Sequence, residues 1–356
     1  MEGKDKVSIV MSCLNTPKDF LDLAIESLLN QTYKNIEFIF INNGGNNFEQ
    51  LKSYELKDKR VKVVNNKITL ELPEALNLGI EMASGTYIAR MDSDDYSMPD
   101  RIKTQVDFLN KNTSIDVCSM YAGIFGARNG LAVYPWCKKE DVKAMLFFSN
   151  EIYHPTVMFR KDFLDKYYLR YRKGINYSED FDMWNRCCEK GSMEIIPLVG
   201  ILYRIHNMSA SITGNQIQVK SKEKVLAYNL SLLSVAESNL KYINCLCNDN
   251  NADINGLCEF ILLVLKQNKI IQYYKQEALQ KTLYRPMCKI IIKRRFNGIT
   301  FYNACICFWK SHLIRYIIAK WYKKNYAKAR FKKSYMLIPG IIKKKLFEKK
   351  RWENVT

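Results

Sequence analysis

Strand-like and helix-like runs alternate over the first hundred residues, and this alternation constrains the fold of the chain more than any other feature. The apolar runs typical of buried strands occupy residues 7–13, 36–41, 61–64 and 87–91, and the runs with helical spacing occupy residues 17–30 and 70–82. Strands that alternate with helices predict a parallel sheet with helical crossovers, so we expect an α/β fold. In such a sheet, ligands bind beyond the carboxyl ends of the strands.

Polar residues follow three of the predicted strands, at the ends where a ligand would bind. In chain order these are Ser12 and Asn15, Asn42 and Asn43, and the cluster Asp92-Ser93-Asp94-Asp95. The three carboxylates of the cluster repel one another, and a hard divalent cation such as Mn²⁺ or Mg²⁺, shared with phosphate oxygens of a ligand, would relieve that repulsion. The cluster also suits a solvated loop that caps the helix beginning near Pro99, and taken alone it leaves both interpretations open.

A second acidic pair, Glu179-Asp180, opens a helix predicted over residues 179–188. Residues 99–110 predict another helix, and strand-like runs occur near Val117 and over residues 156–159. Two acids at the start of a helix are also favoured by the helix dipole, whatever their chemistry.

The basic charge of the chain is confined to its C-terminal part. Residues 1–218 carry 27 basic and 28 acidic side chains, whereas residues 219–356 carry 28 basic and 8 acidic ones, so the net charge of +19 belongs to the second segment. The pattern there changes to long helical runs rich in Leu, Ile, Tyr and Lys. We therefore divide the chain into an α/β domain over residues 1–218 and a basic, mainly α-helical region over residues 219–356.

Several ordered motifs resemble those of the family 2 glycosyltransferases, which have the GT-A fold. The matching runs are residues 7–11, 27–32, 74–80, 83–91 before the acidic cluster and 98–101 after it. The resemblance extends over residues 7–211, which covers nearly all of the neutral segment. It implies that residues 1–218 form a GT-A catalytic domain, a Rossmann-like mixed sheet flanked by helices.

The resemblance implies roles for both acidic groups. Asp92 and Asp94 match the pair that serves the metal and the donor's diphosphate, with Asp94 as the direct metal ligand. A bound cation would stabilise the charge that develops on the leaving phosphates. Asp180 matches the general base, which deprotonates an acceptor hydroxyl that attacks opposite the leaving group and so inverts the anomeric carbon. Glu179 supports or orients this base.

Further residues are expected to contact the nucleotide, the phosphates, the metal and the acceptor. Their places at strand ends assign Ser12, Asn15 and Asn43 to the nucleotide, and the resemblance implies Arg204 and Ser209 for the phosphates, His206 for the metal, and His154 and Trp184 for the acceptor. A lone histidine is most often structural, and Arg204 suits a surface ion pair equally well, so these roles depend on the motifs.

Two positions depart from the pattern of the family. Asn42-Asn43-Gly44-Gly45 stands where Asp-Asp-Gly-Ser is common, and Leu14 stands where an aromatic residue often stacks on the base. Asn43 can still accept a hydrogen bond from uracil through its amide oxygen, with a neutral bond in place of a charge-assisted one. A uridine donor stays the expectation.

Basic and apolar residues are interleaved over residues 281–356, which carry 21 basic and 2 acidic side chains. Residues 310–333 predict a helix with one apolar stripe bordered by lysines, which is the layout of a helix on an anionic membrane surface. The alternative is that this stripe packs on the catalytic domain. Nothing resembles a nucleic-acid-binding motif, and no run reaches the roughly 18 apolar residues of a spanning helix.

The sequence thus predicts a metal-dependent, inverting hexosyltransferase of bacterial capsule, O-antigen or other surface-polysaccharide synthesis. It would move a hexose or N-acetylhexosamine from a UDP-sugar to a polyprenyl-diphosphate-linked saccharide. No secretory signal or metal-binding cysteine spacing is present, so we expect a cytoplasmic protein, peripheral on the inner face of the membrane. Two alternatives stay open: a sugar nucleotidyltransferase, or a catalytically decayed basic protein that binds membranes or nucleic acid.

Overall fold

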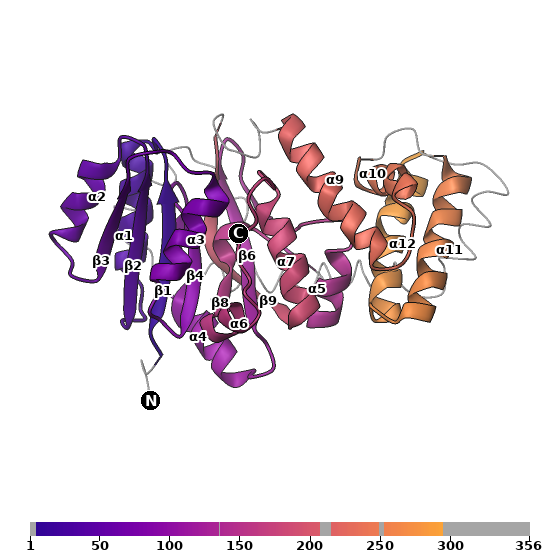
Figure 1. The fold of residues 1–356 in the computed structure, drawn as a ribbon, viewed down its shortest axis with the longest axis horizontal. Helices are drawn as coiled ribbons and strands as arrows, with labels where there is room; N and C mark the ends of the chain where they lie inside the picture. Colours follow the sequence, from indigo (N-terminus) through magenta and orange to yellow (C-terminus); the bar gives the residue numbers. More distant parts are fainter. Residues whose placement is uncertain (1–4, 135, 207–214, 249–252, 295–356) are drawn as a thin grey trace.

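One mixed sheet forms the core of the computed structural model, which describes residues 5–134, 136–206, 215–248 and 253–294. In these residues the sheet has nine strands in the order β3-β2-β1-β4-β8-β6-β9-β5, with β7 paired to β6 (Figure 1). Ser209 and the helix predicted over residues 310–333 lie outside the described residues.

Four parallel strands make up the N-terminal half of the sheet. They are β1 (Val7–Cys13), β2 (Ile36–Asn43), β3 (Val61–Asn66) and β4 (Tyr87–Asp92), connected through α1 (Lys18–Leu29), α2 (Phe48–Glu55) and α3 (Leu72–Met82). The parallel sheet with helical crossovers is therefore confirmed. The sequence does not predict α2, because Leu51 is its one buried side chain and it has no apolar stripe.

The second half adds antiparallel pairs, which make the sheet mixed. Its elements are β5 (Tyr96–Ser97), α4 (Arg101–Lys111), β6 (Val117–Gly126), β7 (Gly130–Ala132), α5 (Lys139–Met145), η1 (His154–Thr156), β8 (Met158–Arg160), α6 (Lys161–Lys166), α7 (Glu179–Lys190) and β9 (Met193–Ile205). Strand β4 pairs with β8 in antiparallel fashion, and β6 pairs with β9 in parallel. The helices predicted over residues 99–110 and 179–188 correspond to α4 and α7.

The register of the strands brings the predicted ligand-side residues to one edge of the sheet. Ser12 on β1 lies beside Asp92 on β4, and Cys13 lies beside Asn42 on β2. Helix α3 packs closely on these strands at Gly79, where an added Cβ would come within 2.3 Å of Val10 Cγ1. This close contact places the loop before α3 near the same edge.

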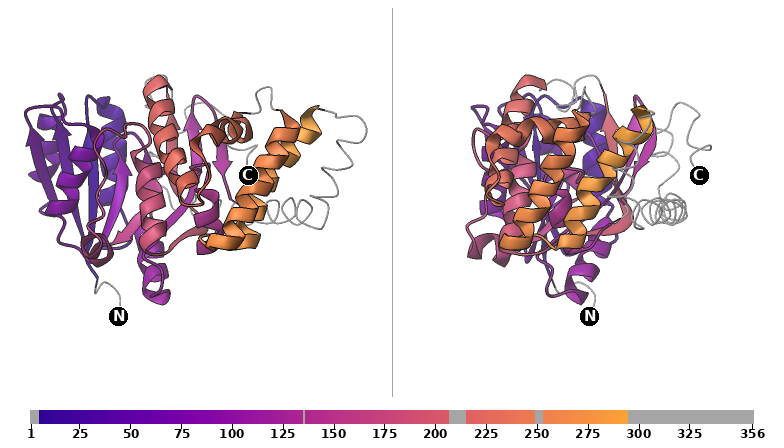
Figure 2. Two further views of the ribbon diagram at one scale, coloured as in Figure 1. Left: turned by 45° about the vertical axis from the view of Figure 1, so that its right-hand side comes forward. Right: turned by 90° about the vertical axis from the view of Figure 1, so that its right-hand side faces the viewer.

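Four helices follow the sheet. They are α9 (Asn215–Ser231), α10 (Leu240–Asn248), α11 (Ile254–Ile271) and α12 (Gln276–Arg294), with the short η2 (Glu237–Asn239) before α10. Helix α9 packs against α7, α12 packs against α5, and α10 and α11 pack on the other helices of this group. Figure 1 shows α10, α11 and α12 at the end opposite β3, and the right-hand view of Figure 2 shows them in front of the sheet. The predicted helical region is confirmed for the described residues.

Apolar side chains of the sheet and of these helices belong to one continuous cluster, which includes Phe147, Trp184, Leu230 and Leu283. A second cluster, with Leu21, Phe38 and Met158, fills the other side of the sheet. The core thus continues across residue 218, and the boundary predicted there from composition stays a prediction. Within the described residues no helix is long and apolar enough to cross a membrane.

Candidate active site

The acidic cluster lies where β4 ends. Asp92 is the last residue of β4, and Arg90, which is only 5% exposed, forms an ion pair through Nη1 with Asp92 Oδ2. An arginine within a buried strand requires such a partner, because an isolated buried charge is costly. Burial raises the pKa of Asp92, and Arg90 opposes that shift.

The end of β9 supplies the residues that face this cluster. His206 directly follows β9, and its Nε2 lies 2.8 Å from Asp94 Oδ2. Arg204 donates from its backbone N–H to Asp95 Oδ1 at 2.7 Å, and from Nε to the carbonyl oxygen of Asp94 at 2.7 Å. Its guanidinium stacks over the ring of Phe20, 4.0 Å from the centroid, which fixes its orientation. The structure therefore brings together Asp94, Arg204 and His206, three of the residues assigned from the sequence.

One carboxyl oxygen of the cluster has no partner in the residues that the structure describes, although Arg90, Arg101 and Arg204 act on its three aspartates. Asp95 is fully buried, and its Oδ2 has no hydrogen-bond partner among the described residues. Burial and the charges of Asp94 and Asp92 raise its pKa well above the usual range. Within the described part of the chain, no three His, Cys, Asp or Glu side chains are grouped so that they could hold a metal ion by themselves. The unpaired oxygen and raised pKa values indicate a site that favours an additional positive charge.

The turn after β2 closes against the loop after β1. Gly44 has a φ of +79°, which favours glycine, and a Cβ at Gly45 would lie 2.7 Å from the backbone nitrogen of Asn15. Asn15 Oδ1 in turn accepts a hydrogen bond from the N–H of Asn46 at 3.0 Å. Asn15 and the half-buried Ser12 thus lie at the same edge of the sheet as the acidic cluster.

Asn43, the predicted uracil contact, makes its hydrogen bonds to the loop before α3 in this structure. It is 4% exposed, its Nδ2 donates to the carbonyl oxygen of Leu70 at 2.9 Å, and its Oδ1 accepts from the N–H of Leu70 at 3.0 Å and from Asn66 Nδ2 at 3.4 Å. Both lone pairs of the amide oxygen are engaged, so this arrangement offers none to a base. Asn43 holds the loop before α3 instead. The amide oxygen of the buried Asn42 has no partner among the described residues.

The second acidic pair opens α7. Asp180 accepts hydrogen bonds from the N–H of Phe181 at Oδ1 and from Asn150 Nδ2 at Oδ2, both at 2.7 Å. Glu179 is 6% exposed, and its Oε2 has no hydrogen-bond partner among the described residues. Burial raises the pKa of Asp180 to about 6, and burial together with the charge of Asp180 raises that of Glu179 to about 7. Carboxyl groups that titrate near neutral pH suit proton transfer.

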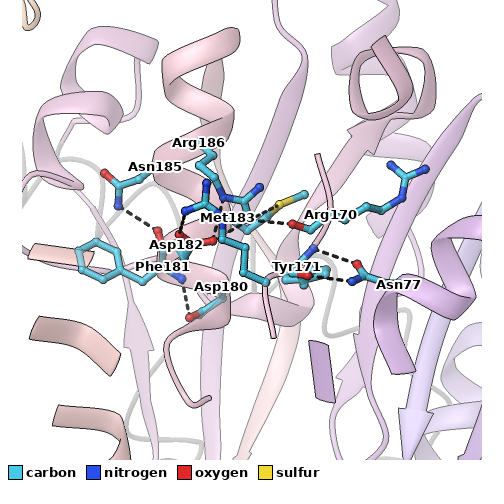
Figure 3. Close-up of polar contacts among 10 residues, drawn as sticks. Asn77, Arg170, Tyr171, Asp180, Phe181, Asp182, Met183, Asn185 and Arg186 are labelled. Atoms are coloured by element: carbon cyan, nitrogen blue, oxygen red, sulfur yellow. Dashed lines mark hydrogen bonds and ion pairs between the residues drawn. The ribbon is translucent and has the colours of Figure 1, made fainter. Parts of the chain in front are cut away.

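The two predicted acceptor residues lie in a buried aromatic group beside this pair. His154 Nε2 lies 2.8 Å from Tyr171 Oη, and its ring centroid is 5.6 Å from that of Trp184. Asn77 holds the backbone of Tyr171 through both ends of its amide, at 2.8 and 2.9 Å (Figure 3). Burial and the charge of Arg90 lower the pKa of His154 well below its usual value, which keeps it neutral. Trp184 is fully buried, so its ring presents no surface for direct contact with an acceptor.

Arg90 connects the two acidic groups, although the sequence analysis gives it no role. Its charge acts on Asp92 and also on Glu179 and Asp180, and it opposes the effect of burial on each pKa. The signal that could have identified it is a charged side chain in an otherwise apolar strand. Asn150 carries no comparable signal, because it lies 30 positions from its partner in the sequence.

Comparisons with known proteins identify related sequences. The family model described as glycosyl transferase family 2 matches residues 8–168. The O-antigen biosynthesis glycosyltransferase WbnJ of Escherichia coli is 38% identical over 216 residues, which cover 58% of this chain and 82% of WbnJ. WfaP of Escherichia coli, named as a UDP-Glc:alpha-D-GlcNAc-diphosphoundecaprenol beta-1,3-glucosyltransferase, is 27% identical over 219 residues, which cover 60% of this chain and 81% of WfaP.

A solved structure shows the same fold. Residues 1–349 of TarS from S. aureus match with a TM-score of 0.52 and 15% identity, over 82% of this chain and 89% of the TarS chain. Structures of the same TarS segment with UDP and with UDP-GlcNAc match with a TM-score of 0.50. Such low identity speaks for the fold alone. The predicted GT-A architecture, a mixed sheet flanked by helices, is confirmed.

Proposed function

The chain belongs to glycosyl transferase family 2, and on this premise we propose that it transfers a hexose or N-acetylhexosamine from a UDP-sugar to a polyprenyl-diphosphate-linked saccharide, with inversion. The observation that carries the proposal is the pair of acidic groups joined by the charge of Arg90. One group lies at the strand ends, where a diphosphate would bind, and the other titrates near neutral pH. The name of WfaP supports this choice of donor and acceptor, and the name of WbnJ supports a role in O-antigen synthesis.

Asp92, Asp94 and His206 would hold a Mn²⁺ or Mg²⁺ ion together with oxygens of the donor diphosphate. The residues fit such an ion, because carboxylates are the ligands that these hard cations prefer. Asp94 and His206 already meet at 2.8 Å, and the Asp95 oxygen without a partner is a place where added positive charge would be favourable. When bound, the ion supplies positive charge that stabilises the leaving diphosphate.

Asp180 removes the proton from the acceptor hydroxyl in this proposal. The hydroxyl oxygen attacks the anomeric carbon while the bond to the diphosphate breaks on the opposite face, and the proton stays on the Asp180 carboxyl until it exchanges with solvent. Glu179 lies beside Asp180, and the charge of Asp180 raises the pKa of Glu179. Proton transfer of this kind typically contributes about 10²–10⁴ in rate.

We also propose that the enzyme works at the inner face of the cytoplasmic membrane, where a polyprenyl-linked acceptor is anchored. Among the described residues, α11 exposes Leu262, Leu263 and Ile270 on the same face as Lys266 and Lys269. An apolar stripe with lysines suits an anionic lipid surface. Most of residues 281–356, which the sequence predicts to contact the membrane, lie outside the described part.

Release of UDP from a panel of UDP-sugars tests the activity, with Mn²⁺ present and GlcNAc-diphosphoundecaprenol or water as acceptor. At least one donor should release UDP, EDTA should abolish the release, and the product should have inverted anomeric configuration. Pyrophosphate release would instead identify a nucleotidyltransferase, and a chain that no sugar nucleotide stabilises would be catalytically decayed.

The metal assignment is tested by thermal unfolding with UDP and Mn²⁺. A ligand at a hundred times its Kd stabilises the native state by about 2.7 kcal/mol. Asp94→Asn should lose the part of this stabilisation that depends on Mn²⁺, whereas Asp107→Asn, an exposed acid on α4, should keep it. Equal Mn²⁺ dependence in both variants would remove Asp94 from the metal site.

The membrane assignment is tested by sedimentation with phosphatidylserine vesicles. Because each lysine near an anionic surface contributes about 1 kcal/mol, Lys266→Glu with Lys269→Glu should weaken binding at least tenfold. Lys59→Glu with Lys111→Glu, at exposed positions on the α/β half, is the matched control. Equal binding by both variants would exclude the α11 face as a contact.

A further inference from the structure

A short segment between α5 and η1 connects the C-terminal helices to the acidic pair of α7. It comprises residues 146–151 and carries Asn150, whose Nδ2 donates to Asp180 Oδ2 at 2.7 Å. The oxygen of the same amide accepts the N–H of Ile152 at 3.1 Å. Because this backbone donor engages the amide oxygen, the amide nitrogen is the end that faces Asp180.

Helix α9 holds the beginning of this segment. Asn229 is fully buried, and its Nδ2 donates to the carbonyl oxygens of Leu146 and Phe147 at 2.9 and 3.1 Å. The ring of Phe147 packs edge-on against Tyr274, which precedes α12, with centroids 5.7 Å apart. Both N–H groups of one buried amide are thus directed to the same short stretch of backbone.

Helices α10 and α12 hold the rest of the segment. Cys247 on α10 donates from Sγ to the carbonyl oxygen of Phe148 at 3.4 Å. Arg285 on α12 forms an ion pair with Glu151, with 3.3 Å between Nη1 and Oε1. Asn150 therefore lies between residues that three different C-terminal helices hold in place.

The same α9 contacts α7 near both of its ends. Gln218 Nε2 donates to the carbonyl oxygen of Tyr177 at 3.2 Å, two residues before α7 begins, and Tyr228 donates from Oη to Glu189 Oε2 at 2.6 Å near the end of α7. Figure 1 shows α9 between α7 on one side and α10 and α12 on the other. One helix thus helps to position both the segment with Asn150 and the helix with Asp180.

We infer that the C-terminal helices position the general base: through residues 146–151 they hold Asn150 against Asp180 and so fix the direction of its carboxylate. The inference rests on the proposed role of Asp180. Asn150, Asn229 and Arg285 are positioning residues, because they act on the reaction through Asp180. Precise placement matters here, since a displacement of about 1 Å in a reacting group can cost about a hundredfold in rate.

Other groups also face Asp180, and they set the background for any test. Glu179 from α7 and Tyr171 interact with its charge, and Arg90 from β4 favours its ionised form. The hydrogen bond from Asn150 likewise favours the ionised carboxylate. Loss of this bond should therefore move the acid limb of the kcat profile to higher pH.

Two variants of the full chain test the inference through UDP release with water and with GlcNAc-diphosphoundecaprenol. Asn150→Ala should lower kcat about ten- to a hundredfold at pH 7, move the acid limb to higher pH, and leave the KM for donor unchanged. Arg285→Met, on α12, should change kcat and the acid limb in the same direction by a smaller factor of about three to ten, and Arg285→Lys should restore most of the loss. Lys138→Met, which removes an ion pair to Glu194 outside the segment, is the matched control.

The double variant identifies the route of the effect. If Arg285 acts through Asn150, adding Arg285→Met to Asn150→Ala should lower kcat no further, whereas independent effects would multiply. UDP-dependent thermal stabilisation shows that each variant is folded, and Glu151→Gln weakens the same ion pair from the other side if Arg285→Met does not fold. Unchanged kcat and pH profile in Asn150→Ala, or multiplying effects in the double variant, would overturn the inference. Full activity of Asp180→Asn would instead overturn the proposed function.

Discussion

At the end of β4, Asp92 forms an ion pair with the buried guanidinium of Arg90. At the start of α7, Asp180 is held by two uncharged donors, the amide of Asn150 and the backbone N–H of Phe181. Both carboxyl groups are half-buried and both have raised pKa values, so the two regions differ in which contacts limit that rise. Direct pairing with a guanidinium limits it for Asp92, whereas hydrogen bonds from neutral groups limit it for Asp180, together with the charge of Arg90.

This difference separates two kinds of work. A carboxylate that contacts a cation is suited to holding charge in place, and the crowded cluster around it favours one more cation. A carboxyl group that is held by neutral donors and titrates near pH 6 or 7 is suited to taking up and releasing a proton. The position of each group in the fold, at a strand end or at a helix start, agrees with this division.

The largest effect is expected from the acceptor side. Asp180→Asn keeps the shape of the side chain but removes the base, so kcat should fall by about 10²–10⁴ while donor affinity stays constant. Glu179→Gln leaves the base in place, so it should change kcat less than tenfold. Steady-state kinetics of UDP release measures both variants, with Asp107→Asn as control. A larger loss in Glu179→Gln than in Asp180→Asn would exchange the two roles.

Removal of the Arg90 guanidinium, whose charge acts on both acidic groups, should destabilise the protein. Arg90→Met leaves the half-buried Asp92 without its partner, and because the Arg90 side chain is only 6% exposed the cost should approach about 3–5 kcal/mol, which is typical for breaking a buried ion pair. Arg60→Met removes a pair with Asp58 in which the arginine side chain is 27% exposed, so it should cost about 1 kcal/mol or less. Urea unfolding at pH 7 measures both. Similar values for the two variants would mean that Arg90 does not unite the two acidic groups as described.

The pH dependence of kcat should reflect the titration of Glu179 and Asp180. Glu179 and Asp180 have raised pKa values of about 7 and about 6, so below pH 6 both hold protons and no base is present. As coupled groups they titrate in two steps, and kcat should fall by up to about tenfold per pH unit below the lower step. A profile that is flat from pH 8 to 5 would argue against a carboxylate base.

The raised pKa values of Glu179 and Asp180 affect stability in the opposite direction: low pH lowers kcat but increases the free energy of unfolding. Because the folded protein binds these protons more tightly than the unfolded chain does, the two groups favour folding at low pH. Their contribution is lost as the pH rises through about 6 to 7. Urea unfolding of Asp180→Asn should therefore depend less on pH in this range than that of the wild type, while its kcat stays low throughout.

Regular apolar spacing explains why most of the fold could be predicted from the sequence. The helix predicted over residues 70–82 is α3, which begins at Leu72 because Glu71 and Glu74 form a capping box there. Local motifs likewise led to Asp94 and His206, which meet in the structure.

The parts of the site that could not be predicted from the sequence depend on contacts between residues far apart in the chain. Asn150 meets Asp180 across 30 positions, and no local spacing encodes that bond. The contacts of Asn43 could not be predicted for the same reason, because its amide turns to the backbone of Leu70, a contact that only the folded loop creates. Arg90 was the exception, since a charge inside an apolar strand is visible in the sequence.

The smallest effect is expected at Asn43, where the resemblance to the family leads us to expect an acid. Asn43→Asp keeps an oxygen that can accept the N–H of Leu70 but loses the donor to the carbonyl oxygen of Leu70, so unfolding should become easier by about 1–2 kcal/mol. UDP affinity should stay unchanged, because the side chain faces the loop and not the ligand. Asn46→Asp, at an exposed position of the same turn, is the control. Tighter UDP binding by Asn43→Asp without loss of stability would return this residue to the nucleotide site.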